Sequence, residues 1–364
     1  MKIAYDHKIF WSQKHGGISR YFVNLFTNFS LKKLDYKVIA PFYKNEYLNK
    51  IDPKNIDGKY MERLLPYTSL FFEKYNEIFS PIKIKKWDPA LIHYTYYYQK
   101  LDKINKPIII TVYDLIHEKI SIENGNPIFP KKRMIEVADH IIAISKKTKE
   151  DLIKIYNIEE KKISVIYLGG DHSQINNIDI SSDLKAFSKP YILFVGSRAK
   201  YKNFSFFLNS YAKSKKLLNQ FDLMLFGGGK LTSQELKLMN LLGIEKNSVK
   251  QINGNDSLLI DLYRKAEAFV FPSLYEGFGI PIIESFINKC PVICSDIEIF
   301  KEIAENSVKY FNPKESLSLT DAMESVIFSP SEKNLLKERG YIQSRKYSWD
   351  KCASETISIY KKFL

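Results

Sequence analysis

One stretch in the C-terminal half most constrains the fold, because an apolar run, a glycine-rich loop and a helical pattern follow one another directly. The run AFVFP (268–272) predicts a buried strand, and IIESFINK (282–289) predicts a helix. Between them, Gly277 and Gly279 leave the backbone free to adopt positive φ and let N–H groups approach a ligand. Pro281 fits the first turn of the helix, whose N-terminus favours an anion. The stretch therefore predicts a strand–turn–helix unit that binds an anionic group.

Two glutamates border this turn. Glu276 lies in the loop and Glu284 about one turn into the helix, so both carboxylates can face one pocket. Carboxylates are poor phosphate ligands but accept hydrogen bonds from hydroxyl groups. A nucleotide sugar, with phosphates in the middle and hydroxyl groups at both ends, matches this arrangement. The alternative, a structural turn with two surface glutamates, is equally consistent with this motif alone.

Apolar runs and helical patterns alternate along the whole chain, which is typical of doubly wound α/β domains with parallel sheets. Strands are predicted at residues 1–5, 34–41, 90–95, 107–112, 141–145 and 163–171 and then, after a break, at 191–197, 221–229, 248–254, 268–272, 290–297 and 309–313. The break at 171–189 is polar and lacks periodicity, which predicts a linker. We therefore expect one Rossmann-like domain over residues 1–170, a second over 190–345, and a final amphipathic helix over 346–364.

Cations and glycines follow some of these strands, at the ends where ligands bind in open α/β sheets. Arg198 and Lys202 follow the first strand after the linker, and two cations close to a helix start suit a diphosphate. Gly16 and Gly17 form a tight turn before a helix with apolar spacing, which makes them a weaker candidate for a phosphate site.

A third group follows PIIITV (107–112), a β-branched run that predicts a central strand. Tyr113, Asp114 and His117 come after it, where chemistry is expected in this class of sheet. A structural role is the alternative for each of them, and more so for His117 than for Asp114.

The composition is typical of a globular protein of a reducing compartment. Hydrophobic residues make up 45% and charged residues 26% of the 364 residues, and the first ten residues are too polar for a signal peptide. A run of about 20 apolar residues is lacking, so a membrane-spanning helix is not expected. The three cysteines fit the cytoplasm, and we expect Cys290 and Cys294 to be buried thiols rather than metal ligands.

The net charge of +14 is concentrated in the first half of the chain. Such a surplus favours contact with an anionic membrane, an acidic substrate or nucleic acid, although a lysine-rich coding bias explains it equally well. The aromatic and basic segment 43–100, which includes Lys83, Lys85 and Lys86, is a candidate for resting on a membrane interface or gripping an acceptor. Aromatic packing in a helical pair is the alternative. A nucleic acid partner is not expected, because this segment offers only a loose version of the required basic and aromatic face.

The motifs together resemble those of retaining glycosyltransferases of family 4, in the same order and over nearly the whole chain. The motifs are GGISRYF (16–22), ADHIIAISKKTKEDL (138–152), VGSRAKYKN (195–203), FGGG (226–229) and EGFGIPIIE (276–284). The resemblance implies the GT-B fold, in which two Rossmann-like domains face each other across a cleft and the last helix crosses back onto the N-terminal domain. It also implies that the N-terminal domain binds the acceptor and the C-terminal domain the nucleotide sugar.

The resemblance further implies a role for each motif residue. Glu284 would bind the ribose of the donor, and Glu276 would contact hydroxyl groups of the transferred sugar. Arg198 and Lys202 would neutralise the departing diphosphate. The other donor-binding residues would lie in the glycine turns and at the helix start: Gly16, Gly17, Gly196, Gly228, Phe278, Gly279 and Ile280.

One position departs from the family pattern. Many members carry His-Asp after the strand that corresponds to residues 107–112, whereas this chain carries Tyr113 and Asp114, with His117 three residues later. A subset of the family resembles this form. The resemblance leaves open which of the three side chains faces the reacting centre.

We therefore expect a retaining transferase that moves a hexose from a GDP- or UDP-linked donor to a glycan hydroxyl group. The acceptor would be lipid-linked, at the inner face of the cytoplasmic membrane, as in surface polysaccharide and lipopolysaccharide synthesis. No cofactor or metal ion is expected, since an Asp-x-Asp motif is absent from the sequence and cations can replace a metal. One alternative is a glycoside hydrolase with Glu276 and Glu284 as its carboxylate pair, which does not explain Arg198 or Lys202. The other is a sugar-nucleotide epimerase on a similar scaffold.

Overall fold

The computed structural model describes residues 1–363 apart from 64, 66, 99–104, 124–130 and 172–188. The chain divides into two compact units. The first comprises Met1–Leu168 together with the C-terminal segment from Trp349, and the second comprises Gly169–Ser348. The linker predicted at 171–189 lies almost entirely outside the described residues.

The first unit is built on a parallel sheet with strand order β3-β2-β1-β4-β5-β6-β7. The strands are β1 (Lys2–Asp6), β2 (Asp35–Tyr43), β3 (Ile56–Tyr60), β4 (Leu91–Tyr94), β5 (Ile108–Val112), β6 (His140–Ala143) and β7 (Ile163–Val165). The helices are α1 (Lys8–Ser12), α2 (Gly17–Leu31), α3 (Ser69–Trp87), α4 (Ile116–Glu123), α5 (Lys132–Val137), α6 (Lys146–Tyr156) and α15 (Trp349–Tyr360), with short 3-10 helices at Tyr47–Lys50, Pro53–Asn55, Glu160–Lys162 and Lys361–Phe363. Because parallel strands end at one edge, the residues after β1, β4 and β5 are neighbours.

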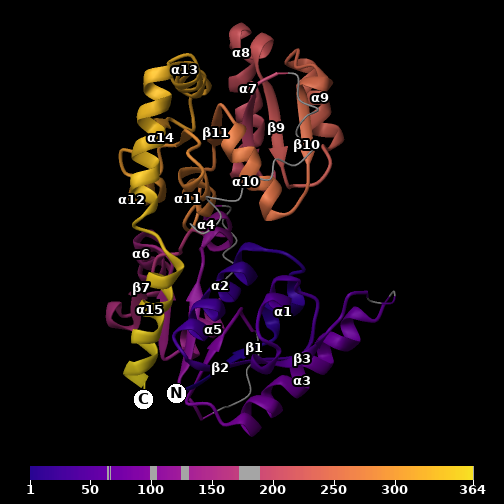
Figure 1. Cartoon of the computed structure of the whole chain (residues 1–364), viewed down its shortest axis with the longest axis vertical. Helices are drawn as coiled ribbons and strands as arrows, with labels where there is room; N and C mark the ends of the chain where they lie inside the picture. Colours follow the sequence, from indigo (N-terminus) through magenta and orange to yellow (C-terminus); the bar gives the residue numbers. More distant parts are fainter. Residues whose placement is uncertain (64, 66, 99–104, 124–130, 172–188, 364) are drawn as a thin grey trace. The chain divides into compact units, whose positions relative to one another are not determined.

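Aromatic side chains fill the space between this sheet and helix α2. The apolar spacing of α2 buries Phe26 and Phe29 next to Tyr5 of β1, with the Tyr5 and Phe26 ring centroids 4.7 Å apart. Helix α15 packs beside α2 (Figure 1). The hydroxyl of its Tyr360 lies 2.6 Å from the Tyr5 hydroxyl and 2.6 Å from Nδ1 of His93. The two ends of the chain therefore share one core, which is the place that the resemblance implies for the last helix.

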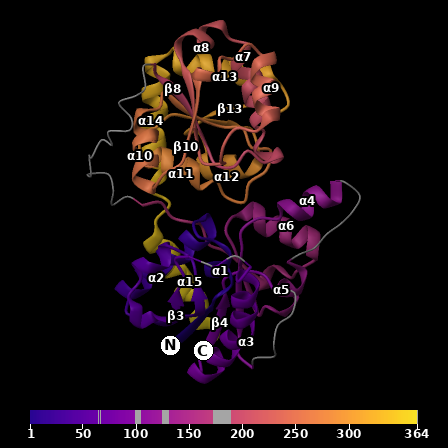
Figure 2. The same cartoon turned by 90° about the vertical axis from the view of Figure 1, so that its right-hand side faces the viewer.

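The second unit is also built on a parallel sheet, with strand order β10-β9-β8-β11-β12-β13. The strands are β8 (Tyr191–Val195), β9 (Asp222–Phe226), β10 (Val249–Ile252), β11 (Ala268–Phe271), β12 (Val292–Ser295) and β13 (Lys309–Phe311). The helices are α7 (Phe204–Ala212), α8 (Lys215–Gln220), α9 (Ser233–Leu241), α10 (Asp256–Lys265), α11 (Ile280–Ile287), α12 (Glu298–Ala304), α13 (Ser316–Ile327) and α14 (Pro330–Ser344), with 3-10 helices at Lys200–Lys202 and Lys246–Ser248. Figure 2 shows α10, α11 and α12 on the opposite face of this sheet from α7, α8 and α13. Two parallel sheets, each covered by helices, confirm the predicted α/β fold with two Rossmann-like domains.

Nearly continuous apolar runs explain the strands of the second unit. All five residues of β8, YILFV, are buried, as a strand covered on both faces requires. Phe207 of α7 and Met323 of α13 belong to the core on one face. Cys290 and Cys294 are buried free thiols, as the sequence predicts. Burial raises the pKa of Cys290, which disfavours the thiolate form that reacts or binds metal.

The largest difference from the sequence-based expectations lies in segment 43–100. The sequence offered a helical pair there only as an alternative, without bounds, whereas the structure shows strand β3 and the 19-residue helix α3. Helix α1 was not predicted either, and the strand expected over 163–171 is short, because β7 ends at Val165. The helix pattern of α3 is hidden in the sequence because its buried face includes the polar residues Asn76 and Ser80.

Candidate active site

Three loops of the second unit meet at one edge of its sheet. Strands β9, β8 and β11 are neighbours, so the loops that follow them, residues 227–232, 196–203 and 272–279, lie side by side. The backbone N–H of Leu274 donates to the carbonyl oxygen of Tyr201 (2.8 Å), which joins the second of these loops to the third. The residues that the sequence assigns to the donor site in this unit all lie on these loops or in helix α11.

The turn into helix α11 requires glycine at position 279. Gly279 has a φ of +100°, which side chains with a Cβ rarely tolerate, and a Cβ there would lie 3.2 Å from the ring of Phe300. Pro281 occupies the first turn, as predicted. Phe278 is buried, with its ring centroid 5.7 Å from that of Tyr347. The loop is thus fixed at the N-terminus of α11, where the helix dipole places partial positive charge.

An ion pair joins the loop after β8 to the loop after β11. Lys202 Nζ lies 2.6 Å from Glu276 Oε1, and their side chains are 14% and 13% exposed. The ammonium group also lies 5.3 Å from the ring centroids of Tyr201 and Phe271, and aromatic faces attract cations. Lys202 is therefore held at the strand ends with its charge directly beside a carboxylate.

The second cation is fixed by a glutamate that was not singled out from the sequence. Arg198 Nε lies 2.6 Å from Glu235 Oε1, and Nη2 donates to the carbonyl oxygens of Gly229 (3.0 Å) and Lys230 (2.8 Å). Glu235 also closes a capping box with Thr232 at the start of α9. Burial opposes ionisation of Glu235, but hydrogen bonds from Thr232 and Arg198 outweigh it and lower the pKa of this carboxyl group. The available sequence signal was the Thr-x-x-Glu pattern of a helix start.

The glycine turn after β9 sets the position of the Arg198 guanidinium. Gly228 has a φ of +73°, and a Cβ on it would lie 2.8 Å from both Arg198 Nη1 and the carbonyl oxygen of Gly196. Gly229 has a similar φ of +75°, but a Cβ there would meet no atom within 4 Å. Close packing between the two loops therefore requires glycine at 228 in particular.

Glu284 projects from helix α11. Its Oε2 accepts a hydrogen bond from the hydroxyl of Tyr263 in α10 (3.2 Å), a residue that was not singled out from the sequence. This contact orients the carboxylate from a second helix. In the part of the chain that the structure describes, no group of three His, Cys, Asp or Glu side chains is arranged to hold a metal ion.

In the first unit, the Gly16–Gly17 turn begins helix α2. Gly16 has an extended backbone (φ 177°), and Gly17 is the first helical residue. Oε1 of Gln13 accepts a hydrogen bond from the backbone N–H of Ser19 (3.3 Å), and a Cβ on Gly16 would lie 2.1 Å from that oxygen. The Gln13 side chain thus covers part of the helix N-terminus that the resemblance assigns to the diphosphate.

The residues after β5 separate into buried and exposed side chains. Tyr113 is buried, and its hydroxyl group has no hydrogen-bond partner within the described residues. Asp114 is half-buried, accepts a hydrogen bond from the N–H of Ile116 (3.2 Å) and lies 3.8 Å from Lys131 Nζ. His117 is exposed on helix α4. The structure keeps Tyr113 and Asp114 at the strand end and directs His117 to the surface.

A buried Asp-His pair lies at the end of β1, with Asp6 as its last residue, and was not singled out from the sequence. The Asp6 carboxylate accepts hydrogen bonds from the N–H of Thr95 (2.5 Å), the N–H of Lys8 (2.9 Å) and the Tyr98 hydroxyl. His7 is 1% exposed, and its Nε2 lacks a hydrogen-bond partner among the described residues. Burial lowers the pKa of His7 to about 4, so the ring is neutral at pH 7. The available signal was Asp-His directly after the first strand, at the ligand-binding edge.

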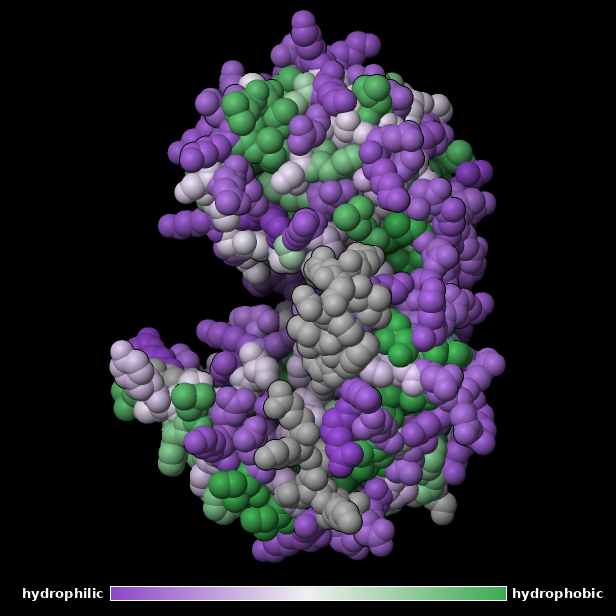
Figure 3. Space-filling model, turned by 180° about the vertical axis from the view of Figure 1, so that it is seen from behind, coloured by the Kyte–Doolittle hydropathy of each residue, from purple (hydrophilic) through white to green (hydrophobic). Residues whose placement is uncertain are grey.

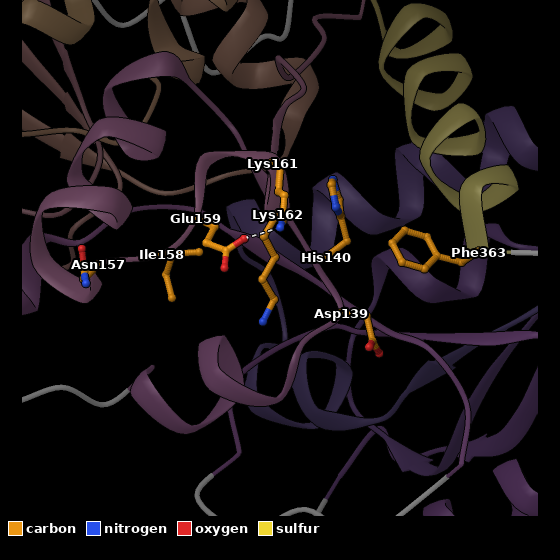
Figure 4. A pocket seen from close by; sticks show the side chains of 8 residues that line it. All are labelled: Asp139, His140, Asn157, Ile158, Glu159, Lys161, Lys162 and Phe363. Carbon is orange, nitrogen blue, oxygen red and sulfur yellow. Dashed lines mark ion pairs between the residues drawn. The ribbon is translucent and has the colours of Figure 1, made fainter.

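A separate pocket lies near the amino ends of β6 and β7, away from the carboxyl ends of the strands. Figure 4 shows the side chains that line it. It is lined by Asp139, His140, Asn157, Ile158, Glu159, Lys161, Lys162 and Phe363. Glu159 pairs with Lys161 (2.7 Å), and Nε2 of His140 lies 2.9 Å from the Ser164 hydroxyl. This pocket contains none of the residues that the sequence assigns to donor or acceptor.

Two family models match the chain one after the other. The model "Glycosyltransferase Family 4" matches residues 15–174, and "Glycosyl transferases group 1" matches residues 177–343. Together they include the Gly16–Gly17 turn and the three loops of the second unit. The chain belongs to glycosyltransferase family 4.

Individual relatives of this family 4 chain match part of its length. It is 31% identical over 202 residues to the O-antigen chain mannosyltransferase RfbU of Salmonella typhimurium. The aligned region covers 54% of each chain. It is 33% identical over 159 residues to an N-acetylgalactosaminyltransferase of Campylobacter jejuni whose name gives a diphospho-undecaprenol substrate, covering 44% of this chain and 42% of the relative. The chain thus spans about half the length of these relatives.

The fold match extends over the whole chain. The crystal structure of WaaG, a glycosyltransferase involved in lipopolysaccharide biosynthesis, aligns with 99% of both chains at a TM-score of 0.74 and 13% identity. The family 4 chain therefore has the GT-B fold.

Proposed function

We propose that this protein transfers a hexose from a GDP- or UDP-linked donor to a glycan hydroxyl group, with retention of the anomeric configuration. One observation carries the proposal: around glycine turns, a single edge of the second unit holds two fixed cations and the carboxylates of Glu276 and Glu284. Cations and backbone N–H groups suit phosphates, and carboxylates suit hydroxyl groups. A nucleoside diphosphate sugar carries both kinds of group.

The diphosphate is assigned to Arg198, Lys202 and the N-terminus of α11. In the proposal, a phosphate of the donor replaces Glu276 as the partner of Lys202. The Glu276 carboxylate then accepts hydrogen bonds from hydroxyl groups of the sugar. Glu284 binds the ribose. Because the diphosphate gains negative charge as the bond to the sugar breaks, cations that are already fixed stabilise the transition state more than the bound donor.

Retention is assigned to a front-face reaction. The bond between the anomeric carbon and the acceptor oxygen forms on the face from which the diphosphate leaves, and the acceptor proton passes to a departing phosphate oxygen. Asp114, at the end of β5, then orients the acceptor rather than removing its proton, and His117 is the other candidate for that task. The proposal needs no metal ion, because Arg198 and Lys202 supply the positive charge.

The acceptor is proposed to be a lipid-linked glycan of surface polysaccharide synthesis, bound by the first unit at the inner face of the cytoplasmic membrane. Two findings support it. One relative is named for O-antigen synthesis and another for a diphospho-undecaprenol substrate. The Asp6–His7 pair and Asp114 place polar groups at the ligand-binding edge of the first unit.

The test is an NMR assay of the purified full chain with UDP- and GDP-hexoses, with and without an extract of lipid-linked glycans. We expect one donor to release its nucleoside diphosphate, detected by phosphorus NMR, only when acceptor is present. The anomeric proton of the product should show the configuration of the donor, and an inverted product would contradict retention. Donor isomerisation without acceptor would favour an epimerase, and glycan cleavage without nucleotide would favour a hydrolase.

A further inference from the structure

Helix α3 packs on the sheet of the first unit through apolar side chains such as Phe72 and Ile84 and through two polar ones. The side-chain amide of Asn76 exchanges two hydrogen bonds with the backbone of Phe42, both of 2.8 Å. The Ser80 hydroxyl donates to the carbonyl oxygen of Ile39 (2.9 Å). The pairing of β2 with β3 shifts register between Ile39 and Phe42. The inner face of α3 thus binds backbone groups at this irregularity.

The face of α3 directed away from the sheet is apolar. Phe71, Ile78 and Ile82 are 65%, 58% and 55% exposed, and their spacing of seven and four residues places them in one stripe. Leu70, which is 69% exposed, lies outside this stripe, on the far side of Lys74. Figure 3 shows hydrophobic side chains on this projecting segment. Large apolar side chains gathered on an exposed helix face mark an interaction site, so we expect a membrane or another molecule to cover the stripe.

Lysines flank the stripe. Lys74, Lys85 and Lys86 are exposed, and no ion pair joins them to a residue that the structure describes. At about 100° per residue, Lys74 and Lys85 lie on one side of the stripe and Lys86 on the other. The acidic residues of the helix, Glu73 and Glu77, instead pair with a lysine of α1 (3.2 and 3.4 Å). The outward face is therefore apolar with a positive border.

We propose that this docking face, the stripe of Phe71, Ile78 and Ile82 with its flanking lysines, rests on the surface of an anionic lipid bilayer. Interfacial helices have this composition and bury their apolar side chains about 5–10 Å into the headgroup boundary. In the described residues no helix has the length and apolar character to cross a bilayer. A second copy fits the face less well, because a twofold contact would bring the same lysines together.

The docking face lies in the first unit and shares no residue with the donor loops. It deepens the proposed function by placing the protein where a lipid-linked acceptor is found, and to that extent rests on it. Binding of the protein to lipid can nevertheless be measured without donor or acceptor, so the two proposals can fail separately.

The test is flotation of the full chain with vesicles of phosphatidylglycerol and phosphatidylcholine, and with phosphatidylcholine alone. We expect binding to the anionic vesicles only, weakened by 1 M salt because screening then shortens to about 3 Å. Changing Lys74, Lys85 and Lys86 to Gln should lower the partition coefficient roughly 100-fold, at about 1 kcal/mol per lysine. Changing Phe71, Ile78 and Ile82 to Ser should lower it by at least roughly 100-fold.

Two matched controls carry the same chemical changes on the second unit. Leu241→Ser, Leu317→Ser and Ile342→Ser alter side chains that are 83%, 60% and 63% exposed. The second control removes three exposed lysine charges with Lys213→Gln, Lys215→Gln and Lys237→Gln.

Loss of vesicle binding in the α3 variants but not in the controls supports the docking face. Absent binding by the wild type, or equal losses in the controls, overturns it. Sedimentation velocity gives a further outcome, since self-association that the serine variant of α3 abolishes would show that a second copy covers the stripe. Vesicle binding without nucleotide binding would contradict the proposed function alone, and the reverse would contradict the docking face alone.

Discussion

Replacing Gly228 by alanine should destabilise the second unit more than the same change at Gly229. Both glycines have positive φ, +73° and +75°, so alanine costs roughly 1–2 kcal/mol at either position for the left-handed backbone. At 228 the new Cβ would also lie 2.8 Å from the carbonyl oxygen of Gly196, whereas at 229 no atom lies within 4 Å. Relieving that overpacked contact adds about 1–3 kcal/mol. The extra cost at 228 is therefore about 2 kcal/mol.

Scanning calorimetry of both variants checks this difference. In a domain of this size about 1 kcal/mol shifts Tm by roughly 2–4 °C, so Gly228→Ala should melt roughly 4–8 °C below Gly229→Ala. The same Cβ would lie 2.8 Å from Arg198 Nη1, so Gly228→Ala should also weaken nucleoside diphosphate binding, while Gly229→Ala should not. Equal Tm values for the two variants would refute the close contact between the loops after β8 and β9.

Three further predictions address the proposed chemistry and the buried histidines. Lys202→Met should slow transfer roughly 10²–10³-fold because a preorganised positive charge is lost, whereas Lys200→Met, at an exposed position of the same loop, should have little effect; similar rates in both variants would contradict the assignment. Transfer should persist in a chelator such as EDTA, and a loss that Mg²⁺ restores would contradict the metal-independent proposal. Burial lowers the pKa of His7 to about 4 and of His93 to about 3, so between pH 6.5 and these values the unfolded chain binds protons that the folded chain does not. The free energy of unfolding should be highest above pH 6.5 and should fall below it by up to roughly 1.4 kcal/mol per pH unit for each histidine. Denaturant titrations of His93→Gln should show a shallower pH dependence, and a profile identical to that of the wild type would count against this account.

The neighbourhood of the donor residues could be predicted because it depends on strand order alone. Arg198 and Glu276 each follow an apolar run that had to be a buried parallel strand, and such strands end at one edge. Which carboxylate meets which cation could not be predicted, because it depends on the conformations of loops far apart in the chain. The sequence therefore indicated only a helix start at Glu235, although its carboxylate pairs with the Arg198 guanidinium.

Helix α3 and the Asp6–His7 pair show where sequence patterns fail. A search for an amphipathic helix assumes that its apolar face is buried, but α3 buries Asn76 and exposes Ile78. His7 follows a strand in a segment that reads as a loop. Its burial depends on contacts with Tyr98, which comes from beyond β4, so no local pattern could predict it.

Calorimetric titration with UDP, GDP, ADP and dTDP tests the central claim, that the second unit binds a nucleotide sugar, most directly. The proteins are the wild type, Glu284→Gln and the control Glu338→Gln, whose carboxylate is exposed on α14. We predict that one nucleotide binds the wild type and the control alike. It should bind Glu284→Gln at least about 10-fold more weakly, because a hydrogen bond to a charged group is worth about 1.5–3 kcal/mol. Absent binding by the folded wild type, or undiminished binding by Glu284→Gln, would contradict the assignment of the donor site.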